Sequence, residues 1–334
     1  MTVLAASTDS ATIEAQLAAA RIAIAALPDV KRVVLTACGG SYAVMLPNEY
    51  LLSTRAVSFS AEAINAAEFT SRDARFIGPD NVVILCSHSG ETPETVAAAK
   101  YARALGALTI ALTHELASPL AQAAEHVIGY QHGTGKSESY VAPALLLRLV
   151  AGLLDDREGA ALSGPIDAAV ARLDELVGAA RAAHADAANA YGFAYRDEPL
   201  IYTMAAGSNF GSAYSFAICL LQEMQWIHSA AIHAGEYFHG PFEVTDVRVP
   251  FIALVGLDGT RAVEERAVAF LTKHSERTLV IDAATFGLEV IDESVRGIAA
   301  HLVFNPVLRV YADALADHRG HPLSVRRYMW RMEY

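Results

Sequence analysis

Several kinds of residue are scarce in this chain, and each scarcity excludes a class of protein. Three cysteines among 334 residues make no disulfide framework, and their spacing fits no zinc site. No apolar run reaches the roughly 20 residues that span a bilayer. The N-terminus also lacks the basic and apolar segments of a secretory signal. We therefore expect a reduced, cytoplasmic protein with no membrane partner.

Positive charge is scarce as well, since 25 Lys and Arg residues face 37 Asp and Glu residues, for a net charge of −12. The absence of a Lys/Arg run argues against nucleic acid as a partner. An acidic protein can still bind an anion locally through hydroxyl groups and backbone dipoles. Hydrophobic residues make up 53% of the chain, which is typical of a helix-rich globular protein, and the length suggests two domains.

Short apolar strands alternate with helical stretches in the first half of the chain, after a helix expected over residues 10–27. Continuous apolar strands separated by helices indicate a parallel sheet covered on both faces, which is the doubly wound α/β class. The expected strands are Lys31–Ala37, Ala56–Ser60, Asn81–Cys86, Ala107–Thr113 and His126–Tyr130.

The alternation restarts in the second half, after a helical connection. The expected strands there are Pro199–Met204, Val249–Val255, Thr278–Ile281 and His301–Phe304, with helices over 211–226, 261–274 and from about Pro306 to Asp317. Both halves open with a strand that runs into a turn of small residues, A-C-G-G-S in the first and A-A-G-S in the second. This weak internal repeat suggests duplication.

A loop rich in hydroxyl groups follows the strand Asn81–Cys86. Pro93 suits the first position of a helix, and Thr92 is then a natural N-cap. The helix N-terminus offers free N–H groups, and Ser87, Ser89 and Thr92 add three hydroxyls that a phosphate group can use. Gly90 lets the backbone turn tightly. A plain strand-to-helix turn would have a similar composition, so the loop alone leaves both interpretations open.

The loop S-H-S-G-E-T resembles the S-x-S-G-x-T phosphate loop of sugar isomerase (SIS) domains, and T-A-C-G-G-S-Y-A resembles their first strand and turn. The two-part layout is similar to the double-SIS proteins, which include the isomerase part of glucosamine-6-phosphate synthase. The resemblance implies two flavodoxin-like domains in tandem and a phosphosugar substrate. It implies phosphate binding by Ser87, Ser89, Thr92, Ser41 and Gly40, with further substrate contacts expected at Gly39, His88, Ser137 and Arg327.

The segment Leu221–Asp246 gathers carboxylates and imidazoles, which acid/base chemistry on a sugar carbon needs. These residues are Glu223, His228, His233, Glu236, His239 and Glu243. Glu223 lies on an apolar helix, where burial of an isolated carboxylate is costly, so it lies at the helix edge or has a function.

The turn His239-Gly240-Pro241 is expected to expose His239 on a loop. His228 and His233 are five residues apart, which is not the spacing of a metal pair on one helix face, so we predict no metal. We expect these two histidines in the interior or at an interface. Glu236 and Glu243 could cap or pair locally.

The spacing of Glu223 and His239, 239 − 223 = 16, is also that of the helix Glu and the loop His in the synthase isomerase domain. The resemblance therefore implies that Glu223 is the proton-abstracting base and that His239, supplied by the neighbouring subunit, assists ring opening. A homodimer with shared active sites follows. Leu220 stands where the synthase has a Lys, and the synthase's C-terminal Lys motif and glutaminase domain are absent, so synthesis of glucosamine 6-phosphate is not expected.

Two distant segments look instead like the fructosamine-6-phosphate deglycases of the fructoselysine and fructose-asparagine type. They are E-Y-F-H-G-P-F-E and the ending H-P-L-x-x-R-R-Y-M-W-x-x-E-Y. This resemblance implies hydrolysis of a 6-phosphofructosamine to glucose 6-phosphate and a free amino acid, without a cofactor. The alternatives are an aminosugar-phosphate deaminase or isomerase and a non-catalytic phosphosugar sensor.

We accordingly expect a first SIS domain over residues 1–158 with the phosphate loop and a second over 159–320 with the acid/base residues. The tail 321–334 is expected to close over the active site. The sequence leaves the released amino acid open, because Arg326, Arg327 and Lys136 could contact its carboxylate or form surface salt bridges.

Overall fold

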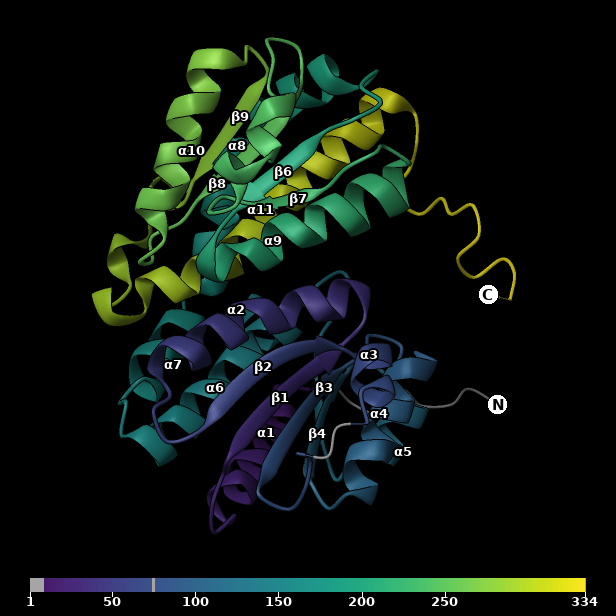
Figure 1. Cartoon of the computed structure of the whole chain (residues 1–334), viewed down its shortest axis with the longest axis vertical. Coiled ribbons are helices and arrows are strands. Elements are labelled where there is room, and N and C mark those ends of the chain that lie inside the picture. The colour runs from purple at the N-terminus through teal and green to yellow at the C-terminus, as the bar shows by residue number, and fades with distance from the viewer. Residues whose placement is uncertain (1–8, 74–75, 334) are drawn as a thin grey trace. The chain divides into compact units, whose positions relative to one another are not determined.

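The computed structural model describes residues 9–73 and 76–333. Its contacts divide the chain after Arg172 into two units. Each unit contains a parallel β-sheet with helices on both faces (Figure 1). This confirms the doubly wound α/β class, because only crossover helices can join neighbouring parallel strands over such short stretches of chain.

The sheet of the first unit has five parallel strands in the order β2-β1-β3-β4-β5. This is the flavodoxin-like order, in which the first strand lies inside the sheet. The strands are β1 (Arg32–Ala37), β2 (Ser60–Asn65), β3 (Asn81–Cys86), β4 (Leu108–Thr113) and β5 (His126–Gly129). Every residue of β3 is buried, as expected of a central strand with helices on both faces.

The strand expected at Ala56–Ser60 is wrong, because β2 begins only at Ser60 and continues to Asn65. As an edge strand, β2 is mostly half-buried and mixes polar with apolar residues, so it lacks the continuous apolar run that marks the inner strands.

Helices cover both faces of this first sheet. Helix α6 packs against both α1 and α2, while α3, α4 and α5 form a second group with β3 and β4. The helices are α1 (Ser10–Ala25), α2 (Gly39–Arg55), α3 (Ala66–Ser71), α4 (Pro93–Ala104), α5 (Pro119–Ala123), α6 (Ala142–Glu158) and α7 (Ser163–Val170). Almost the whole length of α6 up to Leu154 is buried, which explains why this stretch is apolar apart from Arg148.

The second unit has four parallel strands in the order β7-β6-β8-β9. The strands are β6 (Tyr202–Ala205), β7 (Ala231–His233), β8 (Phe251–Val255) and β9 (Thr278–Asp282), and the helices are α8 (Leu173–Tyr195), α9 (Phe210–Ser215), α10 (Arg261–His274) and α11 (Glu293–Arg319). A π-helix, Phe216–Met224, continues α9. Tyr237 and Phe251 pack with Ala267 and Leu271 of α10 in one core cluster.

The strand expected at His301–Phe304 is also wrong, because these residues lie in the middle of α11, a helix of 27 residues. All four are buried, and a short apolar run inside a buried helix cannot be told from a strand by periodicity. Pro306 suggested a helix start at this point, but α11 continues through it. The buried contacts on both sides of Pro306 outweigh the hydrogen bond that a proline cannot donate.

Candidate active site

The hydroxyl-rich loop leaves the first sheet from its central strand. β3 lies between β1 and β4, and the register pairs Cys86 with Ala37 on one side and with Leu112 on the other. The loops that follow these three strands therefore emerge at one edge of the sheet. Ligands of doubly wound proteins bind at this carboxyl edge of the strands.

The loop is held so that its hydroxyl groups gather at the start of α4. Ser87 is buried, and its Oγ lies 2.9 Å from Thr92 Oγ1. Ser89 is exposed, and its Oγ accepts a hydrogen bond of 3.2 Å from the amide of Glu91. Thr92 is the N-cap and Pro93 follows it inside the helix, as predicted. Within the described ranges, the amides of His88, Ser89 and Thr92 donate to no acceptor, so they are available to an anion.

Gly90 is required by the packing beneath the loop. Its φ is +65°, and a Cβ there would lie 2.0 Å from Ser118 Oγ. Its carbonyl accepts a hydrogen bond of 2.9 Å from the amide of Leu120 in α5. The side of the loop that faces α5 is therefore packed against the protein, and the opposite side is left for a ligand.

The turn after β1 lies beside this loop and is open. Gly39 has φ +56°, and a Cβ there would meet nothing within 4 Å. Gly39 and Gly40 are exposed, and Ser41 is half-buried. Burial raises the pKa of the neighbouring Cys86 thiol to about 11, with a smaller opposing effect from Ser41, so Cys86 is not a nucleophile here.

Three histidines that the sequence did not single out as a group meet at the same edge. His88 stacks on His114 with ring centroids 5.3 Å apart, and His132 lies 4.4 Å from His88. His88 Nδ1 is 3.1 Å from the hydroxyl of Tyr130, and His114 Nδ1 donates to the Tyr130 carbonyl at 2.9 Å. Burial lowers the pKa of His88, and the two other imidazoles lower it further.

The signal for this cluster was present in the sequence, since its histidines follow β3, β4 and β5. In the part of the chain that the structure describes, no group of three or more His, Cys, Asp or Glu residues is arranged to hold a metal ion. Ser137 lies on the segment after β5, where its amide donates to Gln131 Oε1 at 2.9 Å.

Glu223 lies near the end of the π-helix Phe216–Met224 in the second unit. Its side chain is 23% exposed and pairs with the guanidinium of Arg326, which is 7% exposed. Both Nε and Nη2 of Arg326 lie 2.8 Å from Glu223 Oε1. The carboxylate that the sequence placed at a helix edge or in a function is thus partly buried and paired with a cation from the C-terminal tail.

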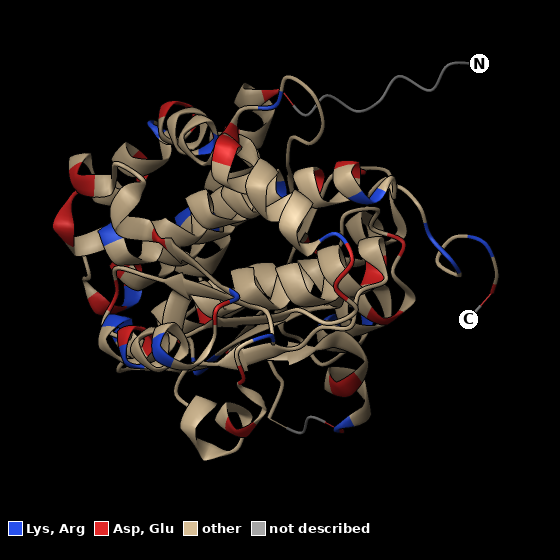
Figure 2. Ribbon diagram, turned by 90° about the horizontal axis from the view of Figure 1, so that it is seen from above, with Lys and Arg blue, Asp and Glu red and all other residues tan. Residues whose placement is uncertain are grey.

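The C-terminal tail is fastened to the residues that follow Glu223. Gln225 Nε2 donates to the carbonyl of His321 at 2.7 Å, and the His321 ring lies 4.5 Å from the Trp226 ring. Arg327 is exposed and stacks its guanidinium over Trp226 at 4.4 Å. Basic positions form a blue stretch on this tail in Figure 2, whereas charges of both signs are interspersed along the helices.

His239 is exposed, as its turn predicted. It ends the 3₁₀ turn Tyr237–His239, and Gly240 follows with φ +141°. Tyr237 anchors the turn in the core, with its hydroxyl 2.6 Å from Thr245 Oγ1. In the described ranges, no hydrogen bond or ion pair joins His239 to Glu223.

The other histidines and glutamates of this segment are exposed too. His228 and His233 lie at the surface of the chain, so the interior alternative is wrong and a position at an interface stays a prediction. His233 is the last residue of the edge strand β7, and His228 lies just before this strand. Their backbones pair with Ala205 and Leu200, whereas both side chains are exposed. Glu236 and Glu243 are exposed and make no side-chain cap bond to the two short 3₁₀ turns beside them.

The turn after β6, which matches the turn after β1 in position, is occupied by the chain itself. Asp258 Oδ2 accepts hydrogen bonds from the amide and the hydroxyl of Ser208, at 2.9 and 2.6 Å. Glu264 is buried and accepts from the amides of Ala206 and Gly256, at 2.8 and 2.7 Å. Burial raises the pKa of Glu264 to about 7. These two carboxyl groups therefore already take the amides of Ala206 and Ser208 and the hydroxyl of Ser208.

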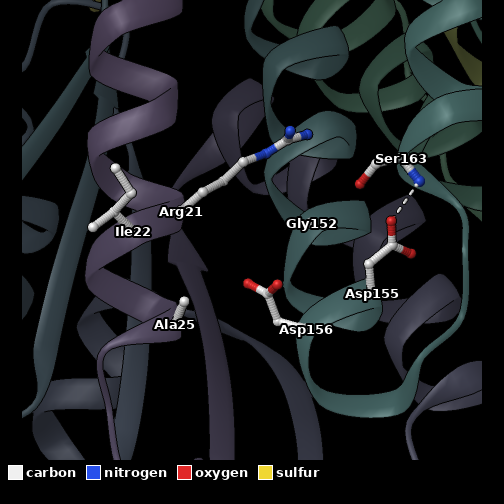
Figure 3. A pocket seen from close by; sticks show the side chains of 7 residues that line it. All are labelled: Arg21, Ile22, Ala25, Gly152, Asp155, Asp156 and Ser163. Carbon is white, nitrogen blue, oxygen red and sulfur yellow. Dashed lines mark hydrogen bonds between the residues drawn. The ribbon is translucent and has the colours of Figure 1, made fainter.

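A hollow of about 310 Å³ lies between α1 and α6 of the first unit (Figure 3). Asp155 at its rim accepts hydrogen bonds from the amides of Leu162 and Ser163, at 2.6 and 2.9 Å, and so fastens the start of α7. Because α1 ends just before β1 begins, this end of α1 lies at the edge where the strands start. The hollow is therefore at the opposite edge from the hydroxyl-rich loop, and we assign it no function.

No helix among the described residues is both long and apolar enough to cross a membrane. Two flavodoxin-like units and an open, hydroxyl-lined loop at a carboxyl edge define a class of tandem α/β proteins built to bind a small anionic ligand.

Comparison with known proteins specifies this class. Residues 26–151 match the SIS domain. The fructosamine deglycase FrlB of Bacillus subtilis (strain 168) is 48% identical over 308 residues, which are 91% of this chain and 93% of FrlB. The fructoselysine 6-phosphate deglycase of Escherichia coli (strain K12) is 29% identical over 92% of this chain and 88% of its own length.

A crystal structure of a Bacillus subtilis protein described as a phosphosugar isomerase has a TM-score of 0.93 and 45% identity, and covers 97% of this chain and 100% of its own. The chain therefore belongs to the SIS-domain family, in the group that contains these fructosamine deglycases.

Proposed function

We propose that this protein hydrolyses a 6-phosphofructosamine, an amino acid adduct of a phosphorylated ketose, to glucose 6-phosphate and the free amino acid. The observation that carries the proposal is the 48% identity to a fructosamine deglycase over nearly the whole length of both chains. The open loop after β3 and the paired carboxylate Glu223 supply the kinds of group that this reaction needs.

The phosphate of the substrate is held by the hydroxyls of Ser87, Ser89 and Thr92. The free amides of the loop and the N-terminus of α4 add donors and a positive dipole end. Ser41 and the backbone at Gly40 complete the phosphate site from the neighbouring turn. The remaining substrate contacts come from Gly39, His88, Ser137 and Arg327.

The chemistry is general acid/base catalysis by Glu223 and His239. His239 helps to open the sugar ring, and Glu223 removes a proton from C1 and returns it to C2. The C2 oxygen gains a proton and the substrate nitrogen loses one, so that the C2 carbonyl becomes a C2 hydroxyl and the C1–N bond becomes an imine. Water then adds to C1, the amine leaves with a proton, and C1 becomes the aldehyde of glucose 6-phosphate. The substrate's own nitrogen forms the imine, so no cofactor is needed.

We further propose that the protein acts as a homodimer in which His239 comes from the partner subunit, and that the C-terminal tail closes over the site. The exposure of His239 and the lack of a bond to Glu223 among the described residues support this arrangement. We place the reaction in the cytoplasm, because a doubly charged phosphate does not cross a bilayer unaided.

The proposal is tested by incubating the protein with a panel of fructosamine 6-phosphates that differ in the amino acid. Glucose 6-phosphate and the free amino acid should appear in equal amounts from at least one of them. Ammonia release from glucosamine 6-phosphate, with no product from the panel, would contradict the proposal and favour a deaminase. Sedimentation of the purified protein tests the dimer separately.

A further inference from the structure

The salt bridge between Arg326 and Glu223 has a one-sided geometry. Two nitrogens of the guanidinium converge on a single carboxylate oxygen, Oε1, at 2.8 Å each. In the part of the chain that the structure describes, the other oxygen, Oε2, accepts no hydrogen bond. One oxygen of the carboxylate is thus fixed, and the other is left to exchange a proton.

Arg326 is itself held from several sides. Its Nη1 donates to the carbonyls of Leu323 and Val325, at 2.7 and 2.9 Å, and its guanidinium lies 5.2 Å from the centre of the Trp330 ring. The side chain is 7% exposed. An arginine with this many fixed contacts orients its partner in a way that a mobile surface cation cannot.

The backbone around Glu223 needs such support. The π-helix ends at Met224, and Trp226 adopts φ +56°, a conformation that costs energy for a residue with a side chain. Gln225 and Trp226 both contact His321 of the tail. The tail therefore fastens both the side chain of Glu223 and the strained backbone just after it.

We propose that Arg326 is a positioning residue, which aims Glu223 Oε2 at the substrate and thereby makes the C-terminal tail part of the proton-transfer machinery. This inference rests on the proposed function, in which Glu223 is the base. Because a reacting group displaced by about 1 Å loses on the order of 10²-fold in rate, removal of Arg326 should act on kcat. The phosphate loop lies in the other unit, so binding of the phosphate should not change.

The experiment compares Arg326→Ala with Arg181→Ala, which removes an exposed charge from α8 of the same unit. Arg326→Ala should lower kcat by about 10²-fold, with KM and the affinity for glucose 6-phosphate within about twofold of wild type. Arg181→Ala should match the wild type in all three quantities. Low concentrations of guanidinium should restore part of the kcat lost in Arg326→Ala, because the cation can occupy the vacated space.

Both substitutions are then combined with Glu223→Gln. If Arg326 acts through Glu223, the double variant Arg326→Ala/Glu223→Gln should have the residual kcat of Glu223→Gln alone. A further 10²-fold loss in the double variant, or a normal kcat in Arg326→Ala, would overturn the positioning role. If the wild type itself releases no product from the whole panel, the proposed function fails, and the role of Arg326 fails with it.

Folding of the variants is checked by fluorescence, because Trp226 and Trp330 are the two tryptophans of the chain and both lie at this contact. If Arg326→Ala does not fold, Arg326→Lys replaces it. Lysine keeps the charge but lacks the planar fork, so kcat should fall about tenfold with an unchanged KM. A wild-type kcat for a folded Arg326→Lys would contradict the proposed geometry.

Discussion

The turns after β1 and β6 occupy matching positions in the two units but differ in what fills them. Gly39 and Gly207 have nearly the same left-handed φ, +56° and +53°. A Cβ at Gly39 would meet nothing within 4 Å, whereas one at Gly207 would lie 2.5 Å from Thr260 Oγ1 and 2.8 Å from the carboxylate of Asp258. The space beside the glycine is thus empty in the first unit and occupied in the second, although the backbone conformation is the same.

The difference shows two ways to satisfy the donors of a strand-to-helix turn. In the second unit the carboxyl groups of Asp258 and Glu264 accept hydrogen bonds from the amides of Ser208 and Ala206, and the negative charge of Asp258 would repel a phosphate. Among the described residues of the first unit, no carboxylate accepts a hydrogen bond from the amides or hydroxyls of the loop after β3. We infer that one copy of a duplicated turn has kept ligand binding while the other has become structural, with the acid/base residues placed elsewhere in the second unit.

The largest effect is expected from Glu223→Gln, which removes the base but leaves the open loop of the first unit intact. The value of kcat should fall by about 10²–10⁴-fold, because general base catalysis contributes this much. The affinity for glucose 6-phosphate should stay the same, as measured by calorimetry. Glu276→Gln, an exposed carboxylate of the same unit, is the control and should be fully active. Near-normal turnover of Glu223→Gln would remove Glu223 as the base.

The hydroxyl-rich loop after β3 and the filled turn after β6 can be compared directly with matched double variants. Ser87→Ala/Thr92→Ala should raise KM and weaken glucose 6-phosphate binding by about 10²-fold, because hydrogen bonds to a charged group are worth about 1.5–3 kcal/mol each. Ser208→Ala/Thr260→Ala removes two hydroxyls from the filled turn and should leave both constants unchanged. A similar loss of binding in both variants would show that the second turn also contacts the phosphate.

The filled turn should make stability depend on pH through Glu264. Burial raises its pKa from 4.5 to about 7 in the folded chain, so folding favours the protonated form. This contribution to stability is complete below pH 4.5 and is lost as the pH rises through 7. Relative to Glu264→Gln, which does not titrate, the wild type should lose on the order of 3 kcal/mol between pH 4.5 and 8 in urea titrations. A constant difference would contradict this.

The smallest effect is expected from adding one methyl group to each turn. Gly39→Ala should cost about 1 kcal/mol, the strain of a left-handed residue with a side chain. Gly207→Ala should cost at least about 1 kcal/mol more, because its Cβ also collides with Thr260 and Asp258. Thermal unfolding of the two variants measures the difference. Equal losses of stability would mean that Thr260 and Asp258 move aside at little cost.

Local chemistry made the hydroxyl-rich loop visible in the sequence, since Ser87–Thr92 and Pro93 are contiguous and their cap geometry is a short-range property. Edge and buried elements were harder to predict. β7 was not predicted because it has three residues, and His301–Phe304 was taken for a strand because a fully buried helix has no polar face.

The contacts of the candidate site were the hardest to predict from the sequence. Arg326 is 103 residues from Glu223, and the three histidines beside the loop lie on separate segments that only the strand order brings together. No local pattern encodes such pairings.

The central claim is that the open loop of the first unit recognises the phosphate of a fructosamine. The most direct test measures glucose or glucose 6-phosphate release by the wild type from one fructosamine with and without its 6-phosphate. We predict efficient turnover of the phosphorylated compound, little turnover of the other, and loss of this preference in Ser87→Ala/Thr92→Ala. Equal turnover of both compounds by the wild type would contradict the account.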